Sequence, residues 1–413
     1  MDGVPFNSET NADRGTLAGG SSASSRFLDL DPNNIAEVNV LKGLSATVLY
    51  GEAGRNGVIL ITTKNGADID LDKKFEITVN QSFHANQIAS LPDDQDAYGN
   101  GFWNNAFGAF SNWGAPFDPG VHTGLFNRLL ASGAGVYDVS DGTIPHPYGG
   151  PNHLPEQFAG ERYSYQAYDN LENFFQTGLI SNTSVNIANR LSEGTTLNFN
   201  YGYRNEEGFV PLSNFTKNTF GLGINSKLSN GLQIRSTFNY VTSDRTAPPV
   251  STSTSSNPND GASLFSNVFY TPRSIDLNGL PFENPADNSS IYYRGNPLQI
   301  QNPYWTLNNT SDTEKLGRFF GTISLSYQIT DWLSANYRYG LDTYSQRQRY
   351  AINKNGGQVA DGLLQTSQRR NVINDHNINL QFNKNITDDI NICLLYTSPS
   401  PRDATLSRMP SSA

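Results

Sequence analysis

The chain has 413 residues and a formal net charge of -10, with 36% hydrophobic and 11% aromatic residues. The aromatic content argues against a disordered chain, the acidic balance argues against a nucleic-acid partner, and a single cysteine, Cys393, excludes both an intramolecular disulfide framework and a CxxC metal site. The longest apolar run, residues 58–61, is far shorter than the roughly 20 residues of a membrane helix, so any membrane span must be a closed β-barrel.

Residues 1–66 form the first expected unit. Residues 31–34 read Asp-Pro-Asn-Asn, which predicts a capped helical turn ahead of a strand at 38–41. Gly51, Gly54 and Gly57 follow, and we expect them to allow positive φ angles where the next strand doubles back. This glycine run is not a phosphate loop, because it lacks the strand-to-helix context and the Gly-Lys-Ser/Thr ending.

From about residue 75 onward, apolar and polar residues alternate with period two, which is typical of strands. Leu197, Phe199 and Tyr201, for example, alternate with polar neighbours. The pattern predicts strands near residues 75–83, 179–190, 195–204, 216–228, 231–244, 316–329, 332–344, 362–383 and 386–392.

The strand cations favour a membrane barrel over a soluble sandwich. Five of them fall in the polar phase of their strands: Arg204, Lys227, Arg235, Arg318 and Arg338. On the lipid face each would cost about 2–4 kcal/mol at mid-membrane, so we expect this phase to face the barrel interior. Lys384 lies in the apolar phase, but at a strand end where its side chain can reach the interface.

The joins between the expected strands alternate in length. The tight joins, at 191–194, 229–231, 330–331 and 383–389, are rich in turn residues. The longer joins lie at about 84–178, 205–215, 245–315 and 345–361, and residues 251–261 within them are of low complexity. Short periplasmic turns and longer extracellular loops are the layout of an outer-membrane barrel.

Residues 38–64 also resemble a known sequence. They read Val-Asn-Val-Leu-Lys-Gly-Leu-Ser-Ala-Thr-Val-Leu-Tyr-Gly and, after five residues, Gly-Val-Ile-Leu-Ile-Thr-Thr-Lys. This text resembles the end of the plug domain in TonB-dependent outer-membrane transporters of the SusC/RagA type. Other blocks are similar to that family in the same order, including Asp-Gly-Val-Pro at 2–5, Asn-Glu-Glu-Gly-Phe-Val at 205–210 and Asn-Pro-Tyr-Trp at 302–305.

Two departures from the family pattern concern the plug. Gly43 stands where the family has Asp, and Arg55 lies two places further along than the family arginine. If the family arginine pairs with a barrel carboxylate, this shift changes which partner Arg55 can reach.

The resemblance implies a mostly β fold: part of an antiparallel transmembrane β-barrel, about nine strands of an expected 22, with the C-terminal part of an α+β plug domain. The implied domains are the plug at 1–66 and the first part of the barrel at 67–392. Residues 393–413 lose the alternation and look like a non-native, adapter-like tail. No signal peptide opens the chain, so we expect it to be incomplete.

The function implied by the resemblance is TonB-dependent import of nutrient oligosaccharides or peptides across the outer membrane of a Gram-negative, Bacteroidota-type bacterium. The implied partners are a SusD-like lipoprotein, the TonB complex, the substrate and outer-membrane lipid. No cofactor, no metal and no enzymatic activity is expected. The alternatives are a surface adhesin or passive pore without energised gating, and an outer-membrane hydrolase.

Candidate site residues come from the plug motif and from one loop. The plug candidates, structural or gating, are Asp2, Gly3, Lys42, Tyr50, Gly51, Arg55, Asn56 and Gly57. The loop aromatics Trp103 and Trp113 either stack on a sugar or fold the loop against the barrel mouth. The five histidines lack metal-ligand spacing, and Asp93, Asp94 and Asp96 read as a solvated loop rather than a calcium site.

Overall fold

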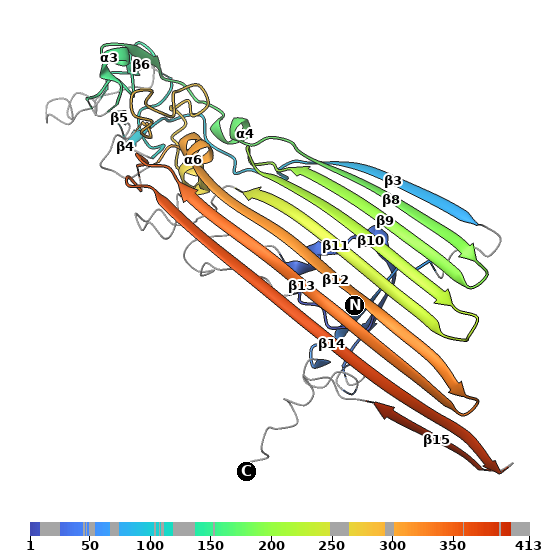
Figure 1. Ribbon diagram of the computed structural model, residues 1–413. Helices are drawn as coiled ribbons and strands as arrows, with labels where there is room; N and C mark the ends of the chain where they lie inside the picture. The colour runs from blue at the N-terminus through green and yellow to red at the C-terminus, as the bar shows by residue number, and fades with distance from the viewer. Residues whose placement is uncertain are drawn as a thin grey trace.

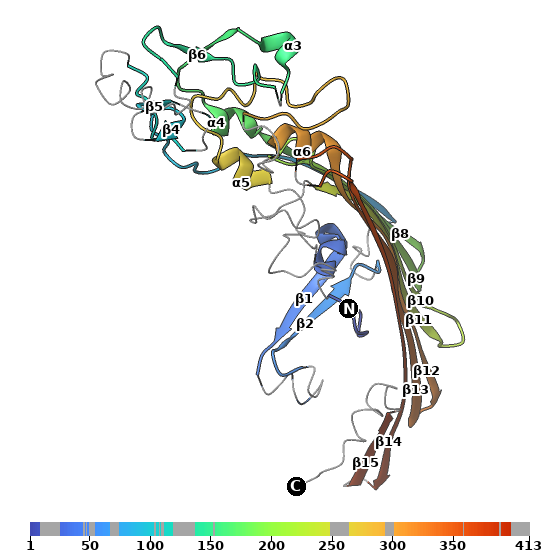
Figure 2. The same cartoon turned by 90° about the vertical axis from the view of Figure 1, so that its left-hand side faces the viewer.

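The computed structural model describes residues 1–8, 25–43, 46, 48, 54–66, 74–102, 105–106, 108, 111–118, 137–151, 153–247, 264–293, 301–357, 359–387 and 390–397. Among these residues, no helix has both the length and the apolarity needed to cross a membrane. They form a curved sheet, a small module on its concave side and a cap of folded loops at one end (Figure 1, Figure 2).

One antiparallel sheet makes up the body of the described chain. Its nine strands lie in chain order, β15-β14-β13-β12-β11-β10-β9-β8-β3. They are β3 (Phe75–Asn86), β8 (Gly178–Ser192), β9 (Thr195–Glu207), β10 (Asn214–Lys227), β11 (Gln233–Ala247), β12 (Thr310–Thr330), β13 (Leu333–Ile352), β14 (Leu363–Thr387) and β15 (Ile390–Thr397). The predicted mostly β, antiparallel fold is confirmed, and each strand overlaps its expected range.

The two faces of the sheet carry different side chains. On the concave face Asn200, Asn239 and Arg318 are buried, whereas on the convex face Phe220 and Tyr240 are 41% and 46% exposed. Leu197, Ile234 and Leu325 share the convex phase and are partly exposed. The five predicted cations all lie in the concave phase, so the sequence assigned the two faces correctly.

Lys384 is the exception that the sequence predicted. It lies in the convex phase close to the end of β14, and its Nζ is 5.7 Å from the ring centroid of Trp332. The charge therefore has an aromatic partner near the turn end of the sheet.

The last strand continues further than expected. β15 pairs with β14 up to Thr397, opposite Asn379, although we expected the native fold to stop at about Ile392. Strand pairing uses backbone groups and does not require alternating side chains. The alternation is lost all the same, since Leu395 and Tyr396, on opposite faces, are 66% and 62% exposed.

Short and long joins alternate along the sheet. The short ones are 193–194, 228–232, 331–332 and 388–389, and the longer ones are 87–177, 208–213, 248–309 and 353–362. In Figure 1 the longer joins lie at one end of the sheet and the short turns at the other. This arrangement confirms the alternation read from the sequence. The low-complexity stretch at 251–261 lies outside the described residues.

The described residues 1–8, 25–43 and 54–66, here called the N-terminal module, lie on the concave side of the sheet (Figure 2). They form two 3-10 turns, η1 (Arg26–Asp29) and η2 (Pro32–Asn34), and an antiparallel hairpin of β1 (Ile35–Leu41) and β2 (Val58–Thr63). The Asp31 side chain caps η2 by accepting from the Asn33 N–H, as the turn sequence predicted.

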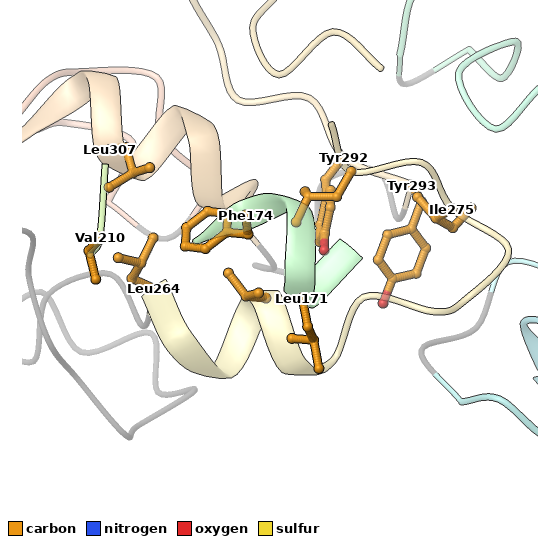
Figure 3. Packing of buried hydrophobic residues seen from close by; sticks show 10 residues of the cluster. Leu171, Phe174, Val210, Leu264, Ile275, Tyr292, Tyr293 and Leu307 are labelled. Atoms are coloured by element: carbon orange, nitrogen blue, oxygen red, sulfur yellow. The ribbon is translucent and has the colours of Figure 1, made fainter. Parts of the chain in front are cut away.

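The longer joins fold together into a loop cap, defined here as the described residues of 87–177, 208–213 and 264–309. Its elements are β4 (Gly101–Phe102), β5 (Asn105–Ala106), β6 (Thr143–Pro145), α3 (Pro155–Phe158), β7 (Arg162–Ser164), α4 (Asn170–Phe174), α5 (Leu264–Phe269) and α6 (Pro303–Asn309). Figure 3 shows Phe174, Leu264 and Leu307 meeting in one apolar cluster. The cap thus has a hydrophobic core of its own.

A buried arginine ties the first long join to the third. Arg273 is 6% exposed and contacts the carboxylates of Asp96 and Asp169, the latter at 3.1 Å. Asp96 therefore has a protein partner, Arg273.

Candidate functional site

The contact between the N-terminal module and the concave face of the sheet is the candidate site. Asp2 lies at its centre: its carboxylate accepts from the Thr63 N–H at 2.8 Å, from Thr63 Oγ1 at 2.7 Å and from Thr237 Oγ1 on β11 at 2.9 Å. Asp2 and Gly3 both have positive φ, 46° and 80°. Of these two predicted residues, Asp2 therefore links the hairpin to the sheet.

Glycines on the concave face let the module approach the strand backbone. A Cβ at Gly221 would lie 2.7 Å from the Asn34 amide nitrogen, and one at Gly202 would lie 2.5 Å from an Asp31 carboxylate oxygen. At Gly340 a Cβ would contact the Val4 side chain. Because these positions lack side chains, polar groups of the module reach the strands directly.

Polar contacts connect the two parts along much of this contact surface. Asn34 Nδ2 donates to Asn239 Oδ1 at 2.7 Å, and Thr219 Oγ1 donates to Asp31 at 3.0 Å. Lys217 Nζ donates to the carbonyls of Leu28 and Leu30 at 2.8 and 3.0 Å. The module is thus held by hydrogen bonds that water can replace.

Arg318 on β12 is the most buried charge of this contact, with no exposed surface. Its guanidinium binds Asp342 on β13 through two bonds, Nε–Oδ1 at 2.9 Å and Nη2–Oδ2 at 2.7 Å. Nη1 donates to Asp29 of the module at 2.9 Å, and Nη2 donates to the Asn7 carbonyl at 2.9 Å. The Phe6 ring lies 3.6 Å from the guanidinium carbon, so the module encloses the arginine.

A second arginine, from the module itself, extends this network. Arg26 contacts Glu314 of β12 at 2.7 Å and Asp29 at 3.7 Å. Glu314 also lies 4.0 Å from Arg245 and accepts from Gln348 at 3.1 Å. We call Arg26, Asp29, Arg245, Glu314, Arg318 and Asp342 the ion network. Its three cations balance its three anions.

The ion network adds little net stability to the docked module, so this contact can be broken and formed again. Buried ion pairs gain little net stability over apolar packing, but removal of one partner leaves an uncompensated charge. Burial raises the pKa of the Asp29 carboxyl, whereas Arg26 and Arg318 oppose that shift. If the module moves away, the charges on both sides can be hydrated again, which favours separation over the rupture of an apolar core.

In the described residues, one small apolar cluster also joins the two parts. Leu30 and Ile61 of the module meet Val241 and Phe320 of the sheet. Next to them lies a small cavity lined by Asp31, Asn34, Asn200, Thr219 and Asn239, among others. The described residues contain no group of three His, Cys, Asp or Glu side chains that could hold a metal ion.

The other predicted site residues lie away from the sheet or outside the description. Lys42, Arg55 and Asn56 are exposed at the Leu41–Val58 end of the hairpin. Gly57 has φ 92°, and a Cβ there would lie 3.0 Å from the Leu41 carbonyl oxygen, as expected for a glycine where the chain doubles back. Tyr50, Gly51 and Trp103 lie outside the described residues.

The loop aromatics behave in two ways. Trp113 is 76% exposed on the loop cap, whereas Phe117 packs on Tyr165 with ring centroids 5.0 Å apart. The folding role fits Phe117, and Trp113 keeps a free aromatic face.

Sequence reasoning missed most of the ion network. Arg318 was noted only as a cation in the polar phase, and Arg26, Asp29, Glu314 and Asp342 were not singled out. One available signal was that Glu314 and Asp342 share the polar phase of neighbouring strands with Arg318, which places three charges on the face that a module would cover.

Two curated relatives match parts of the chain, although no protein-family model matches it. TonB-dependent receptor P26 of Formosa agariphila is 28% identical over 193 residues, which is 42% of this chain and 17% of that protein. TonB-dependent receptor P3 of the same organism is 39% identical over 66 residues, which is 16% of this chain and 6% of that protein. The match thus spans a small part of each relative's length.

Solved structures match the fold over nearly all of the chain. The RagAB peptide importer in its open-open state has a TM-score of 0.61 at 18% identity, over 93% of this chain and 41% of that chain. The RagAB peptide transporter has a TM-score of 0.61 at 16% identity, over 92% and 40%. The nine-stranded sheet therefore has the fold of part of the matched RagAB chains.

The matched proteins are TonB-dependent receptors and a peptide importer, which agrees with the resemblance to SusC/RagA-type TonB-dependent receptors and with the outer-membrane location that the sequence predicts.

Proposed function

Because this chain is a relative of the TonB-dependent receptors, we propose that it forms the plug and the first barrel strands of an outer-membrane importer. Residues 1–66 would be the later part of the plug, and residues 67–392 the first part of the barrel. The observation that carries this proposal is Arg318, a barrel-strand cation enclosed by Asp29, Asn7 and Phe6 of the N-terminal module. An arginine of the concave face that the module covers can be hydrated again when the module moves, which suits a gate that opens and closes.

In this proposal the substrate passes when the inner-membrane TonB complex pulls the plug. Displacement of the N-terminal module exposes the ion network and the hydrogen bonds of Asp2, Asp31 and Asn34 to water, so each lost contact is replaced by hydration. No covalent chemistry is needed, because the energy comes from the pulling complex. The concave face of the sheet becomes the wall of the pathway.

We propose a nutrient oligosaccharide or a peptide as the substrate, delivered with a SusD-like lipoprotein at the surface. The exposed ring of Trp113 on the loop cap supports recognition at that end, since a free aromatic face can stack on a sugar or a peptide side chain. Binding of a labelled glycan panel and a labelled peptide panel to the receptor that carries this chain separates the two classes.

A disulfide across the gate tests the proposal. A Cβ at position 221 would lie 3.2 Å from Asn34 Cγ. In a disulfide, the corresponding distance from Cβ to the partner sulfur is about 3 Å. We therefore expect N34C/G221C to form a bridge between plug and barrel, and C393S removes the exposed native thiol that would compete.

Oxidised N34C/G221C receptor should lose substrate uptake in cells, and a reducing agent should restore it. The single variants N34C and G221C are the matched controls, and both should transport under either condition. Unchanged uptake by the fully bridged receptor would contradict gating by the plug and favour the passive pore or adhesin.

A further inference from the structure

The convex face of β11 to β14 changes from apolar to basic along one line. On this face the apolar band ends at Phe319 on β12 and Val372 on β14, both paired with Thr343 of β13, and one exposed apolar side chain, Leu364, follows four rungs beyond Val372. The next outward rungs are Gly317, Ser345 and Arg370, then Lys315, Arg347 and Gln368, then Thr313, Arg349 and Thr366. We call Lys315, Arg347, Arg349 and Arg370 the basic patch.

The basic patch is short of countercharge within the protein. Lys315 and Arg347 are directly opposite on neighbouring strands, an arrangement in which like charges are destabilising. Asp244 contacts Lys315 at 2.9 Å, and Arg349 donates to Ser311 at 3.2 Å. Beyond Phe319, the described outward positions of β11 to β14 carry these four cations and one carboxylate, Asp244. Their net charge is therefore +3.

All four side chains of the basic patch are exposed. An exposed like-charged cluster without enough internal anions attracts anions from its surroundings.

The height of the patch matches the edge of the membrane. On β13 the outward apolar residues run from Leu333 to Leu341, with Thr343 next. Ten residues of strand at about 3.3 Å each, tilted by about 40°, span roughly 25 Å, which is the height of an outer-membrane apolar band. The basic patch begins one rung further on, at the level of lipid headgroups.

We propose that the basic patch binds the phosphate groups of anionic lipids in the outer leaflet. The inference rests on the proposed function for its orientation, with the loop cap outside the cell. Arginine suits this role, because its planar guanidinium can donate two parallel hydrogen bonds to a phosphate. Arg347, Arg349 and Arg370 lie on adjacent rungs. This spacing allows different arginines to bind the two phosphates of one headgroup.

The test measures lipid binding to the purified receptor that carries this chain, in neutral detergent and without substrate. The probes are diphosphorylated lipid A, its dephosphorylated form and inorganic phosphate, at equal concentrations, with bound lipid quantified by native mass spectrometry. The variants are R347Q/R349Q/R370Q, the charge-retaining R347K/R349K/R370K, and the control K227Q/R235Q/K354Q, which removes three exposed cations elsewhere.

The glutamine variant should bind lipid A about a hundredfold more weakly, at about fivefold per arginine. The lysine variant should keep most of the affinity, which also shows that the patch tolerates substitution, and the control should stay within about twofold of wild type. Unchanged binding in the glutamine variant, equal binding of the dephosphorylated lipid, or full competition by inorganic phosphate would each overturn the proposal. The lipid-binding assay does not depend on substrate uptake, so its result would hold even if the disulfide test contradicted gating by the plug.

Discussion

Arg318 shows how one residue couples two parts of the molecule. Its two carboxylate partners belong to different parts, Asp29 to the N-terminal module and Asp342 to the sheet, and all three side chains are at most 5% exposed. A residue in this position is hard to replace, because its loss leaves the buried Asp342 without a countercharge and leaves Asp29 with Arg26 alone.

We predict that R318M destabilises the docked module by about 3–5 kcal/mol, the usual cost of breaking a buried ion pair on one side. The readout is the urea midpoint, together with protease cleavage of residues 1–66. R204M is the control, since Arg204 pairs with Glu206 in a partly exposed bridge worth under about 1 kcal/mol.

The triple variant R318M/D29N/D342N should recover part of the lost stability, because it also removes the two carboxylate charges that Arg318 binds. If R318M and R204M shift the midpoint equally, the ion network does not hold the module.

Two histidines in the loop cap are bonded so that only their neutral forms fit. His153 Nε2 donates to the Tyr292 carbonyl at 2.8 Å, while its buried Nδ1 has no hydrogen-bond partner. His146 Nδ1 accepts from the Tyr148 N–H at 3.1 Å, so it cannot carry a proton there. Burial lowers the pKa of both histidines; Glu161 opposes this shift for His146, and the hydrogen bond to the Tyr292 carbonyl opposes it for His153.

We therefore predict that the loop cap is acid-sensitive. In the unfolded chain a histidine has a pKa of about 6.5, and above this pH both histidines are neutral in the folded and the unfolded cap, so the cap has its full stability. Below this pH the unfolded cap binds protons before the folded cap does, so the free energy of unfolding falls. The fall ends once the pH is below the pKa of the histidines in the folded cap. Hydrogen exchange of residues 137–165 at pH 7.5 and 5.5 measures this.

The double variant H146N/H153Q supplies the control for that measurement. Asn and Gln can keep the acceptor and the donor without titrating, so the variant should show little change between the two pH values. An acid response as large as that of the wild type would contradict the histidine assignment.

At the scale of elements, strand β10 shows how closely the module approaches the sheet. A Cβ at Gly223 would contact the Asn65 Cα and lie 2.5 Å from the Lys64 carbonyl oxygen. Both are backbone atoms at the end of the hairpin, and they cannot rotate away as a side chain can.

We predict that G223A displaces the end of β2 from the sheet and costs about 1–3 kcal/mol, as overpacking usually does. G317A is the matched control, because its Cβ would lie 3.8 Å from the Tyr240 hydroxyl in ordinary contact. Protease susceptibility of the N-terminal module should rise for G223A alone, and equal behaviour of the two variants would show that the close approach has no energetic weight.

At the scale of the whole molecule, the described sheet has two edges. Strand β3 pairs with β8 and strand β15 pairs with β14, and in the described residues neither has a second neighbour. Open edges present unpaired backbone groups that can pair with another chain.

We predict that the 413-residue chain expressed alone associates or fails to insert into lipid. Size-exclusion chromatography with light scattering in detergent provides the measurement, and the receptor that carries this chain is the comparison, with monodisperse behaviour expected. A monomeric, conducting species from the 413 residues alone would contradict this expectation.

Much of the fold was predictable because it depends on local periodicity. The period-two pattern located all nine strands, and the phase of Arg204 and Arg318 identified the concave face, since a sheet with lipid on one side must separate polar from apolar residues residue by residue. Turn residues at 193–194 and 331–332 likewise marked the short joins.

The candidate site was less predictable, because it depends on contacts between distant segments. Arg26 and Glu314 are 288 residues apart in the chain, and nothing near either residue indicates the other. The loop cap is a similar case: Phe174, Leu264 and Leu307 look like ordinary loop residues until three joins pack together.

The sequence by itself determined the strand pattern, the two faces and the resemblance to SusC/RagA-type receptors, since these follow from side-chain alternation and short motifs. Only the tertiary structure decided which charges meet, because burial and pairing of Arg318 with Asp29 arise when the module lies within the curve of the sheet.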